Sequence, residues 1–441
     1  MVKHRWASSL DVPDIKQVLK HIEEHRDDSI TYLQSLVRRY PEGEEPLQEH
    51  LLAHFRDLGC QVHVEKLLPT TVQLSKEFAA EETIDMTLRM HIIGKLGGSG
   101  GGRSLMLITH PDGDPIRTET WQKPPHEGLI EKGRMYGWGV ADDLAGIAMM
   151  VEATKALTAT GIKLRGDLYL MSACAKRNAW GIAALLMAGY KADAAIYVHP
   201  AESELGMKEI KAMTSGLLKF RITIQGRKPP KTEFVQTTFN HLGVNPVEKA
   251  IDITRALQKL NEERNRRVYY KPLVDSVGRS TNLLIPYIQA GTMSNLTDVP
   301  TYCVIAGSLT FPPTEDIDDV MKEVEDYLVT LFDSDEYLRL NRPTLEWIQG
   351  TQGVEMREDL PIVQVTKKAI ESMIGTLPFS NPLYSKSDLR TPVLIAGIPN
   401  VAFGPLAGDL ATTGGRDEWV DVDDYICSIK VLAKIILAWC S

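Results

Sequence analysis

The stretch Ser104-Leu-Met-Leu-Ile-Thr-His-Pro-Asp112 decides the fold class, because a short apolar strand ends there in a histidine and a carboxylate. Outward from it, helical periodicity over residues 144–157 and 181–189 alternates with strand-like apolar runs over 166–172 and 194–199. Alternating strands and helices are typical of an α/β sheet with parallel strands, whose functional groups lie past the carboxyl ends of the strands. The sequence therefore predicts an α/β domain with a site at those strand ends.

The middle of the chain follows another pattern. Its segments have the order β-α-β-β-α-β of a small ferredoxin-like domain, over residues 217–225, 245–264, 282–289, 301–311, 316–332 and 344–349. After it, α/β character returns with a helix over 360–374, a strand over 393–396 and a helix from Val422. We therefore predict an α/β catalytic mixed-sheet domain, residues 1–212 and 351–441, that is interrupted by an inserted ferredoxin-like α+β domain, residues 213–350.

The composition excludes several classes of protein. The chain has 441 residues, of which 43% are hydrophobic and 24% charged, unlike disordered, collagen-like or disulfide-scaffold proteins. Its net charge of −9 disfavours nucleic acid or an anionic membrane as a partner. The five cysteines form no CxxC pair, and no apolar run reads as a signal core or a membrane span. We expect a cytoplasmic protein that acts on a small molecule.

Three segment ends carry potential metal ligands. His110 and Asp112 follow one predicted strand, His199 follows another, and Asp142 stands between a turn and a helix. Taken singly, each has an ordinary explanation, such as a surface loop for a histidine or helix capping for Asp142. Together, two imidazoles and a carboxylate suit one divalent transition metal, and Asp112 suits the group that fixes the tautomer of His110.

The order of these motifs resembles that of the zinc aminoacylase, carboxypeptidase and acetylornithine deacetylase family of metallopeptidases. Its members carry His-x-Asp, a spaced Trp and a Gly-rich stretch that ends in a metal-bridging Asp, which match His110-Pro-Asp112, Trp121 and residues 133–142. The resemblance continues through Lys386-Ser-Asp-Leu-Arg390 and Asp417-Glu418. It implies a catalytic α/β domain with a ferredoxin-like lid, and it implies that His110, Asp142 and His199 are metal ligands.

The sequence departs from the family pattern where a second metal would bind. Family members have a Glu-Glu pair, a general base and a ligand, where this chain has Ala175 and Lys176, and a closing His where it has Gly414. The Lys176 ammonium would also repel a second cation. We therefore expect one divalent transition metal (Mn, Zn or Co). Because Ala175 cannot act as a base, hydroxide on that metal is the expected nucleophile.

Further residues are candidates for catalysis and substrate binding. We assign Asp112 and Lys176 to catalysis, and the candidates for substrate binding are Arg177, His241, Asn295 and Arg390. A structural ion pair explains Arg390 equally well. His241 matches a lid histidine that the family offers to the partner subunit's site, but a surface histidine is the ordinary alternative, as turn capping is for Asn295.

The chain has His110, Asp112, Asp142 and His199 together, and their joint retention favours an enzyme over a catalytically dead binding protein. The resemblance implies hydrolysis of a C–N bond, and a one-metal site without a base suits attack on an activated carbon. The sharpest interpretation is hydrolytic deamination of an activated aromatic amine such as 5-nitroanthranilate, whose nitro group takes up electrons during attack. The alternatives are an amidohydrolase of the aminoacylase or deacetylase type that acts on a small N-acyl amino acid, and a catalytically dead binding protein. A lid of this type also implies a homo-oligomer.

Overall fold

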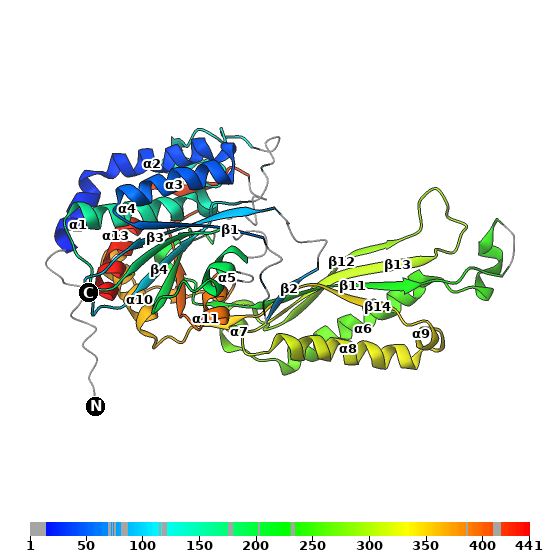
Figure 1. Ribbon diagram of the computed structural model, residues 1–441. Coiled ribbons are helices and arrows are strands. Elements are labelled where there is room, and N and C mark those ends of the chain that lie inside the picture. Colours follow the sequence, from blue (N-terminus) through cyan, green and yellow to red (C-terminus); the bar gives the residue numbers. More distant parts are fainter. Residues whose placement is uncertain are drawn as a thin grey trace, which may run out of the picture.

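The computed structural model describes residues 15–68, 72, 74, 76–80, 87–113, 116, 121–174, 180–201, 203–230, 234–384, 387–408 and 416–441. These residues form an α/β domain and an elongated second domain that extends from one side of it (Figure 1). The predicted fold class, a mixed-sheet domain with an inserted α+β domain, is confirmed.

A six-stranded mixed sheet forms the centre of the α/β domain. Its strand order is β1 (Gln61–Leu67), β3 (Arg89–Leu96), β7 (Leu168–Ser172), β4 (Leu105–Thr109), β8 (Ala194–Val198) and β17 (Asn400–Phe403). The last four strands are parallel, whereas β3 is antiparallel to both of its neighbours. Every residue of β4 and β8 is buried, which explains why their sequences are continuously apolar.

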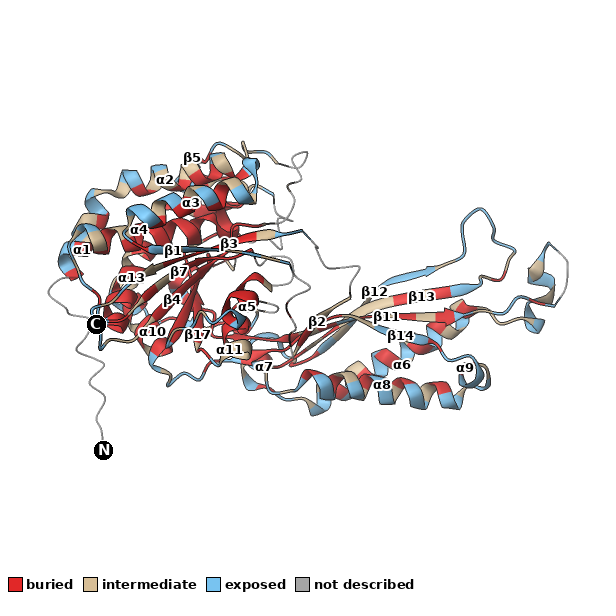
Figure 2. Ribbon diagram, in the orientation of Figure 1, coloured by how far each residue is buried: buried red, intermediate tan, exposed pale blue. Residues whose placement is uncertain are grey.

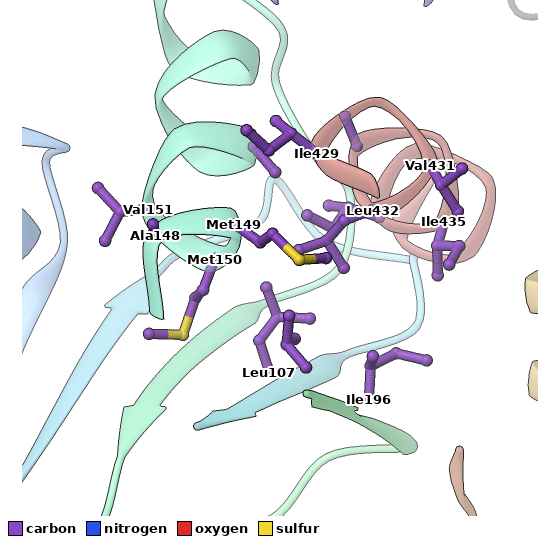
Figure 3. Close-up of a cluster of buried hydrophobic side chains, with 14 of the residues drawn as sticks. Leu107, Ala148, Met149, Met150, Val151, Ile196, Ile429, Val431, Leu432 and Ile435 are labelled. Carbon is purple, nitrogen blue, oxygen red and sulfur yellow. The ribbon is translucent and has the colours of Figure 1, made fainter. Parts of the chain in front are cut away.

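Helices cover both faces of this sheet. One face packs against α3 (Glu44–Asp57), α4 (Ala145–Ala159), α10 (Pro361–Ile374) and α13 (Val422–Cys440), and α1 (Ile15–Glu24) and α2 (Arg26–Arg39) pack on α4 and α13. The other packs against α5 (Trp180–Met187) and α11 (Arg390–Ala396). Figure 3 shows Met149 of α4 and Leu432 of α13 gathered over Leu107 and Ile196 of the sheet. Figure 2 shows buried residues concentrated in this layered core.

The inserted domain, called the lid below, is a second sheet with helices on one face. Its antiparallel order is β12 (Asn282–Ala290), β13 (Tyr302–Phe311), β11 (Gly216–Gln225), β14 (Thr344–Thr351) and β2 (Glu77–Ala79). Alternate residues of β11 are buried under α6 (Pro246–Arg267) and α8 (Ile317–Ser334). The chain order from β11 to β14 is the predicted β-α-β-β-α-β, with the short helices α7 (Lys271–Val277) and α9 (Glu336–Leu340) added.

Small strand pairs join distant segments of the chain. The chain enters and leaves the lid side by side, because β10 (Met213–Thr214) pairs with β15 (Val354–Glu355). Near the site, β18 (Trp419–Asp421) pairs with β6 (Arg134–Tyr136), which pairs with β5 (Leu129–Glu131). A fourth small pair joins β9 (Glu209–Ile210) to β16 (Phe379–Ser380). None of the described helices combines the length and apolar character needed to cross a membrane.

Two features of the fold differ from the prediction. The apolar run 393–396, expected to be a strand, lies in helix α11, and the strand of this region is β17. Periodicity cannot separate a buried helical turn from a buried strand in so short a run. In addition, β2, which comes from the first half of the chain, forms an edge strand of the lid sheet beside β14. A pairing across so long a sequence separation has no local signal.

Candidate active site

The carboxyl ends of two adjacent parallel strands build the site. His110 directly follows β4 and His199 directly follows β8, and these strands are neighbours in the sheet. Asp142 lies in η6 (Val140–Leu144), the turn that leads into α4. A Cβ on Gly146 would lie 2.1 Å from the Val198 carbonyl oxygen, so a glycine there lets α4 start directly against the end of β8. This close approach holds Asp142 beside both histidines.

Gly139, three residues before Asp142, is also a position where only glycine fits. Gly139 has φ +76°, in the left-handed region that favours glycine, and a Cβ there would lie 2.5 Å from the Tyr40 ring. The Tyr40 ring in turn packs edge-to-face on Trp138, with 4.6 Å between the ring centroids. The segment that carries Asp142 therefore packs against Tyr40, the residue that follows α2.

His110, Asp142 and His199 converge on one point. Asp142 Oδ1 lies 3.1 Å from His110 Nε2 and 3.2 Å from His199 Nε2, and none of the three side chains is more than 6% exposed. One potential ligand atom from each lies within 4.8 Å of the others. Among the described residues, these form the group of at least three potential ligands that could hold a metal ion.

The donor set fits a divalent metal. His110 Nδ1 lies 2.7 Å from the Asp112 carbonyl oxygen and His199 Nδ1 lies 2.9 Å from that of Pro200. A neutral imidazole that donates its Nδ1 proton to a carbonyl leaves the Nε2 lone pair free. In that tautomer each ring presents its Nε2 lone pair to the carboxylate of Asp142, and a cation between the three groups removes the repulsion. Residues His110, Asp142 and His199 would hold that ion.

The charges around His110 also favour a cation at this site. Burial disfavours the imidazolium, but the hydrogen bond to Asp142 and the charges of Asp142, Asp143 and Asp112 offset this and raise the pKa of His110 to about 10. Burial and the adjacent Asp142 charge also raise the pKa of Asp143 well above its usual range. The site therefore attracts positive charge, whether a proton or a metal ion.

Asp112 occupies its predicted place but makes a different contact. The hydrogen bond that orients His110 goes to the main-chain carbonyl of Asp112, while its carboxylate Oδ1 is 3.7 Å from the ring nitrogen. Its Oδ2 instead accepts a hydrogen bond from Arg89 Nη1 at 3.1 Å, and the same Arg89 nitrogen bonds to Glu44 at 3.2 Å. Arg89 therefore partly neutralises Asp112, and sequence reasoning did not identify it.

Lys211 is a second group that sequence reasoning missed. It is 4% exposed, and its Nζ lies 3.2 Å from His199 Nδ1 and 4.2 Å from the centre of the Tyr384 ring. An ammonium this close to a candidate ligand weakens the attraction of the site for a cation. The sequence does carry one indication of this role. Lys211 is the single charged residue in the apolar run Ile210-Lys-Ala-Met213, and an isolated charge in such a run is often buried with a partner.

Of the remaining candidate residues, the two in the lid lie apart from this cluster, and two others are not placed. Lys176 and Arg177 lie outside the described residues, as do Ala175 and Gly414. In the lid, Asn295 is exposed beyond the end of β12, and His241 is exposed in η8 (Gln236–Leu242). Figure 1 shows that η8 lies at the end of the lid far from the α/β domain.

Arg390, predicted to bind substrate, forms a buried ion pair instead. Its Nε donates to Glu77 Oε2 at 3.0 Å, its Nη2 donates to the other Glu77 oxygen, and its Nη1 donates to the Ser387 carbonyl at 2.8 Å. Arg390 is 1% exposed. The structural alternative considered from the sequence is therefore the one observed.

Comparison with known proteins agrees with the geometry of the site. A model of peptidase family M20/M25/M40 matches residues 106–438, which include all three converging side chains. The chain belongs to this family. The resemblance inferred from the motifs is thereby confirmed, and the chain is an enzyme of a hydrolase family.

Relatives of this M20/M25/M40 chain cover nearly its whole length. An N-formyl-4-amino-5-aminomethyl-2-methylpyrimidine deformylase of Halalkalibacterium halodurans is 24% identical, over 97% of this chain and 97% of the relative. The dipeptidase Dug1p of Saccharomyces cerevisiae has a similar structure, with 15% identity, a TM-score of 0.69, and 97% and 98% of the two chains covered. The YXEP protein of Bacillus subtilis, described as a dinuclear metal binding peptidase, has 14% identity, a TM-score of 0.60, and coverage of 94% and 98%.

Proposed function

We propose that the chain is a one-metal hydrolase that replaces the amine of an activated aromatic ring with hydroxyl, with 5-nitroanthranilate as the best candidate substrate. The observation that supports this is the convergence of His110, Asp142 and His199 on one point, together with Ala175 and Lys176 at the family's base and second-ligand positions. An activated carbon needs less help from a general base than an amide does, because the nitro group accepts the electrons.

Each residue of the site has a defined task in this proposal. A divalent metal, when bound, supplies Lewis acidity that polarises a substrate and lowers the pKa of water. The Asp112 and Pro200 carbonyls hold the two imidazoles in orientation, and Asp142 supplies the negative charge. Burial of all three side chains excludes bulk water and strengthens their electrostatic effect. Lys176 and Arg177 stay candidates for holding the substrate carboxylate, since Arg390 is engaged by Glu77.

The relatives favour a second candidate reaction. The deformylase named above is similar over nearly the full length of both chains, which supports hydrolysis of a formamide on an aminopyrimidine. Both candidate substrates are small planar rings that carry an amine. They differ in the bond broken: deamination releases ammonia and leaves a phenol, whereas deformylation releases formate and leaves an amine.

One assay separates these reactions. Purified protein is incubated with Mn²⁺, Zn²⁺ or Co²⁺ and with 5-nitroanthranilate, an N-formyl aminopyrimidine or a panel of N-acyl amino acids. We expect ammonia and 5-nitrosalicylate from the first substrate. Formate without ammonia would replace the proposal by the deformylase reaction, and amine release from N-acyl amino acids would replace it by the aminoacylase reaction. Tight binding of these compounds without any turnover would mean that the chain is a binding protein.

We also propose that the lid joins two copies of the chain through β12. This strand lies at the edge of the lid sheet, and among the described residues it pairs with β13 on one side. Its exposed side chains include Leu284, Tyr287 and Ile288, which are 61%, 46% and 56% exposed. An apolar edge strand of this kind is suited to pairing with a second copy.

A lysine on this edge is expected to produce a monomer. Ile288→Lys places a charge where the second copy would pack, so light scattering after size-exclusion chromatography should show the mass of one chain for the variant and a multiple of it for the unmodified protein. Leu340→Lys is the matched control, because Leu340 is an exposed lid residue (74%) at the end of α9, away from the edge. Equal masses for the unmodified protein and Ile288→Lys would refute the interface.

A further inference from the structure

Two histidines on the solvent side of α3 bring their ring nitrogens together. His50 and His54 are four residues apart on α3, so they share one face of that helix. Their Nε2 atoms are 3.2 Å apart, and the ring planes are nearly perpendicular, at 84°. Both side chains are partly exposed, so an ion can reach them from solvent. Neither residue belongs to the active site described above.

We propose that His50 and His54 form a second metal site, which binds a divalent transition ion through both Nε2 atoms. With metal–nitrogen bonds of about 2.0–2.1 Å, an N···N separation of 3.2 Å corresponds to an N–metal–N angle of about 100°, near the tetrahedral value. The remaining positions of the ion take water. Imidazole ligands select Zn²⁺, Cu²⁺ or Ni²⁺ over Mg²⁺ and Ca²⁺, which prefer oxygen.

Charged groups of both signs surround the pair. The carboxylates of Asp57 and Glu152 act on His54, opposed by Lys155. Arg39 acts on His50, opposed more weakly by Glu42. Burial is the largest influence on each ring and lowers the pKa of both histidines, so both are neutral and can act as ligands at pH 7.

Tyr32 adds a polar group beside the pair. Its ring lies edge-on to His54, with 4.9 Å between the centroids. Its hydroxyl is buried and has no hydrogen-bond partner among the described residues.

Another histidine pair with the same spacing shows that spacing alone does not make such a site. His21 and His25 are also four residues apart, but α1 ends between them at Glu24 and their rings are stacked, with centroids 4.0 Å apart. His25 Nδ1 bonds to the His21 carbonyl at 2.9 Å. These rings are stacked and His25 Nδ1 is engaged by the main chain, which makes this pair a control for the spacing.

Metal titration of four variants tests the site. The full chain is loaded at its active site, dialysed and titrated with Zn²⁺ by isothermal calorimetry, and the unmodified protein should bind a further, weaker equivalent. His50→Ala or His54→Ala should weaken that equivalent by about 100-fold, because the second imidazole acts as an intramolecular ligand. His25→Ala should leave it unchanged. His110→Ala should remove the tight equivalent and keep the weak one.

The outcomes that overturn the site are distinct from failure of the proposed function. If the unmodified protein binds no weaker equivalent, or if His25→Ala weakens it as much as His54→Ala does, the site is refuted. Circular dichroism checks that each variant is folded. Turnover by His54→Ala should equal that of the unmodified protein, since neither histidine takes part in the reaction, and any substrate hydrolysed in the function assay serves for this comparison.

Discussion

Replacing His110 or Asp142 with alanine is expected to abolish hydrolysis and tight metal retention together. Asp142 Oδ1 lies within 3.2 Å of both His110 Nε2 and His199 Nε2, so each substitution removes one of three converging donors. Loss of a group that merely orients a ligand weakens metal binding by about 10–100-fold, and loss of a ligand should exceed that range. Turnover should fall to background because no cation then polarises the substrate.

Elemental analysis after dialysis and a turnover assay measure the two effects on the same samples. Asp142→Asn keeps the size of the side chain and removes its charge, so it should lose the metal as well if charge is what holds it. His63→Ala is the control, because His63 is an exposed histidine on β1, far along the chain from the cluster. Unchanged metal content in both His110→Ala and Asp142→Ala would overturn the assignment of the site.

The parts of the site that were predicted from sequence lie at the ends of buried parallel strands. β4 and β8 are buried on both faces, so their sequences are uninterrupted apolar runs, and the first polar residue after each run marks the edge of the sheet. His110 and His199 stand at those positions. Because β4 and β8 are adjacent and parallel, residues that follow their carboxyl ends lie close together, so the sequence alone was enough to predict this pair.

Contacts between distant segments could not be predicted in the same way. The Asp112 carboxylate meets Arg89 from an antiparallel strand, and Lys211 reaches His199 from a short strand connection beyond β8. Each partner is an ordinary charged residue in its own sequence context. Nothing local distinguishes an arginine that binds a substrate from one that neutralises a buried carboxylate, so the sequence is compatible with both interpretations of Arg390.

The second large effect is expected at Arg390, where substitution should destabilise the fold. Arg390→Met leaves the Glu77 carboxylate buried without its guanidinium, and breaking a buried ion pair from one side costs about 3–5 kcal/mol. Removing both charges should recover part of this loss, because Glu77 is then no longer a buried charge without its partner, whereas Asp388, 3.7 Å from Arg390 Nη1, still loses the guanidinium. Urea unfolding of Arg390→Met and of the double variant Arg390→Met/Glu77→Met measures the difference.

The location of this ion pair predicts which part of the molecule loosens first. Glu77 begins β2, whose residues pair with β14 of the lid, while Arg390 begins α11 of the α/β domain. The pair therefore ties the edge of the lid sheet to the other domain, and in Arg390→Met hydrogen exchange should rise first in β2 and β14. A substrate-binding role would instead raise KM at unchanged stability, with no recovery in the double variant. Because only the ion-pair role predicts recovery by a second substitution at Glu77, the two variants together decide between these roles.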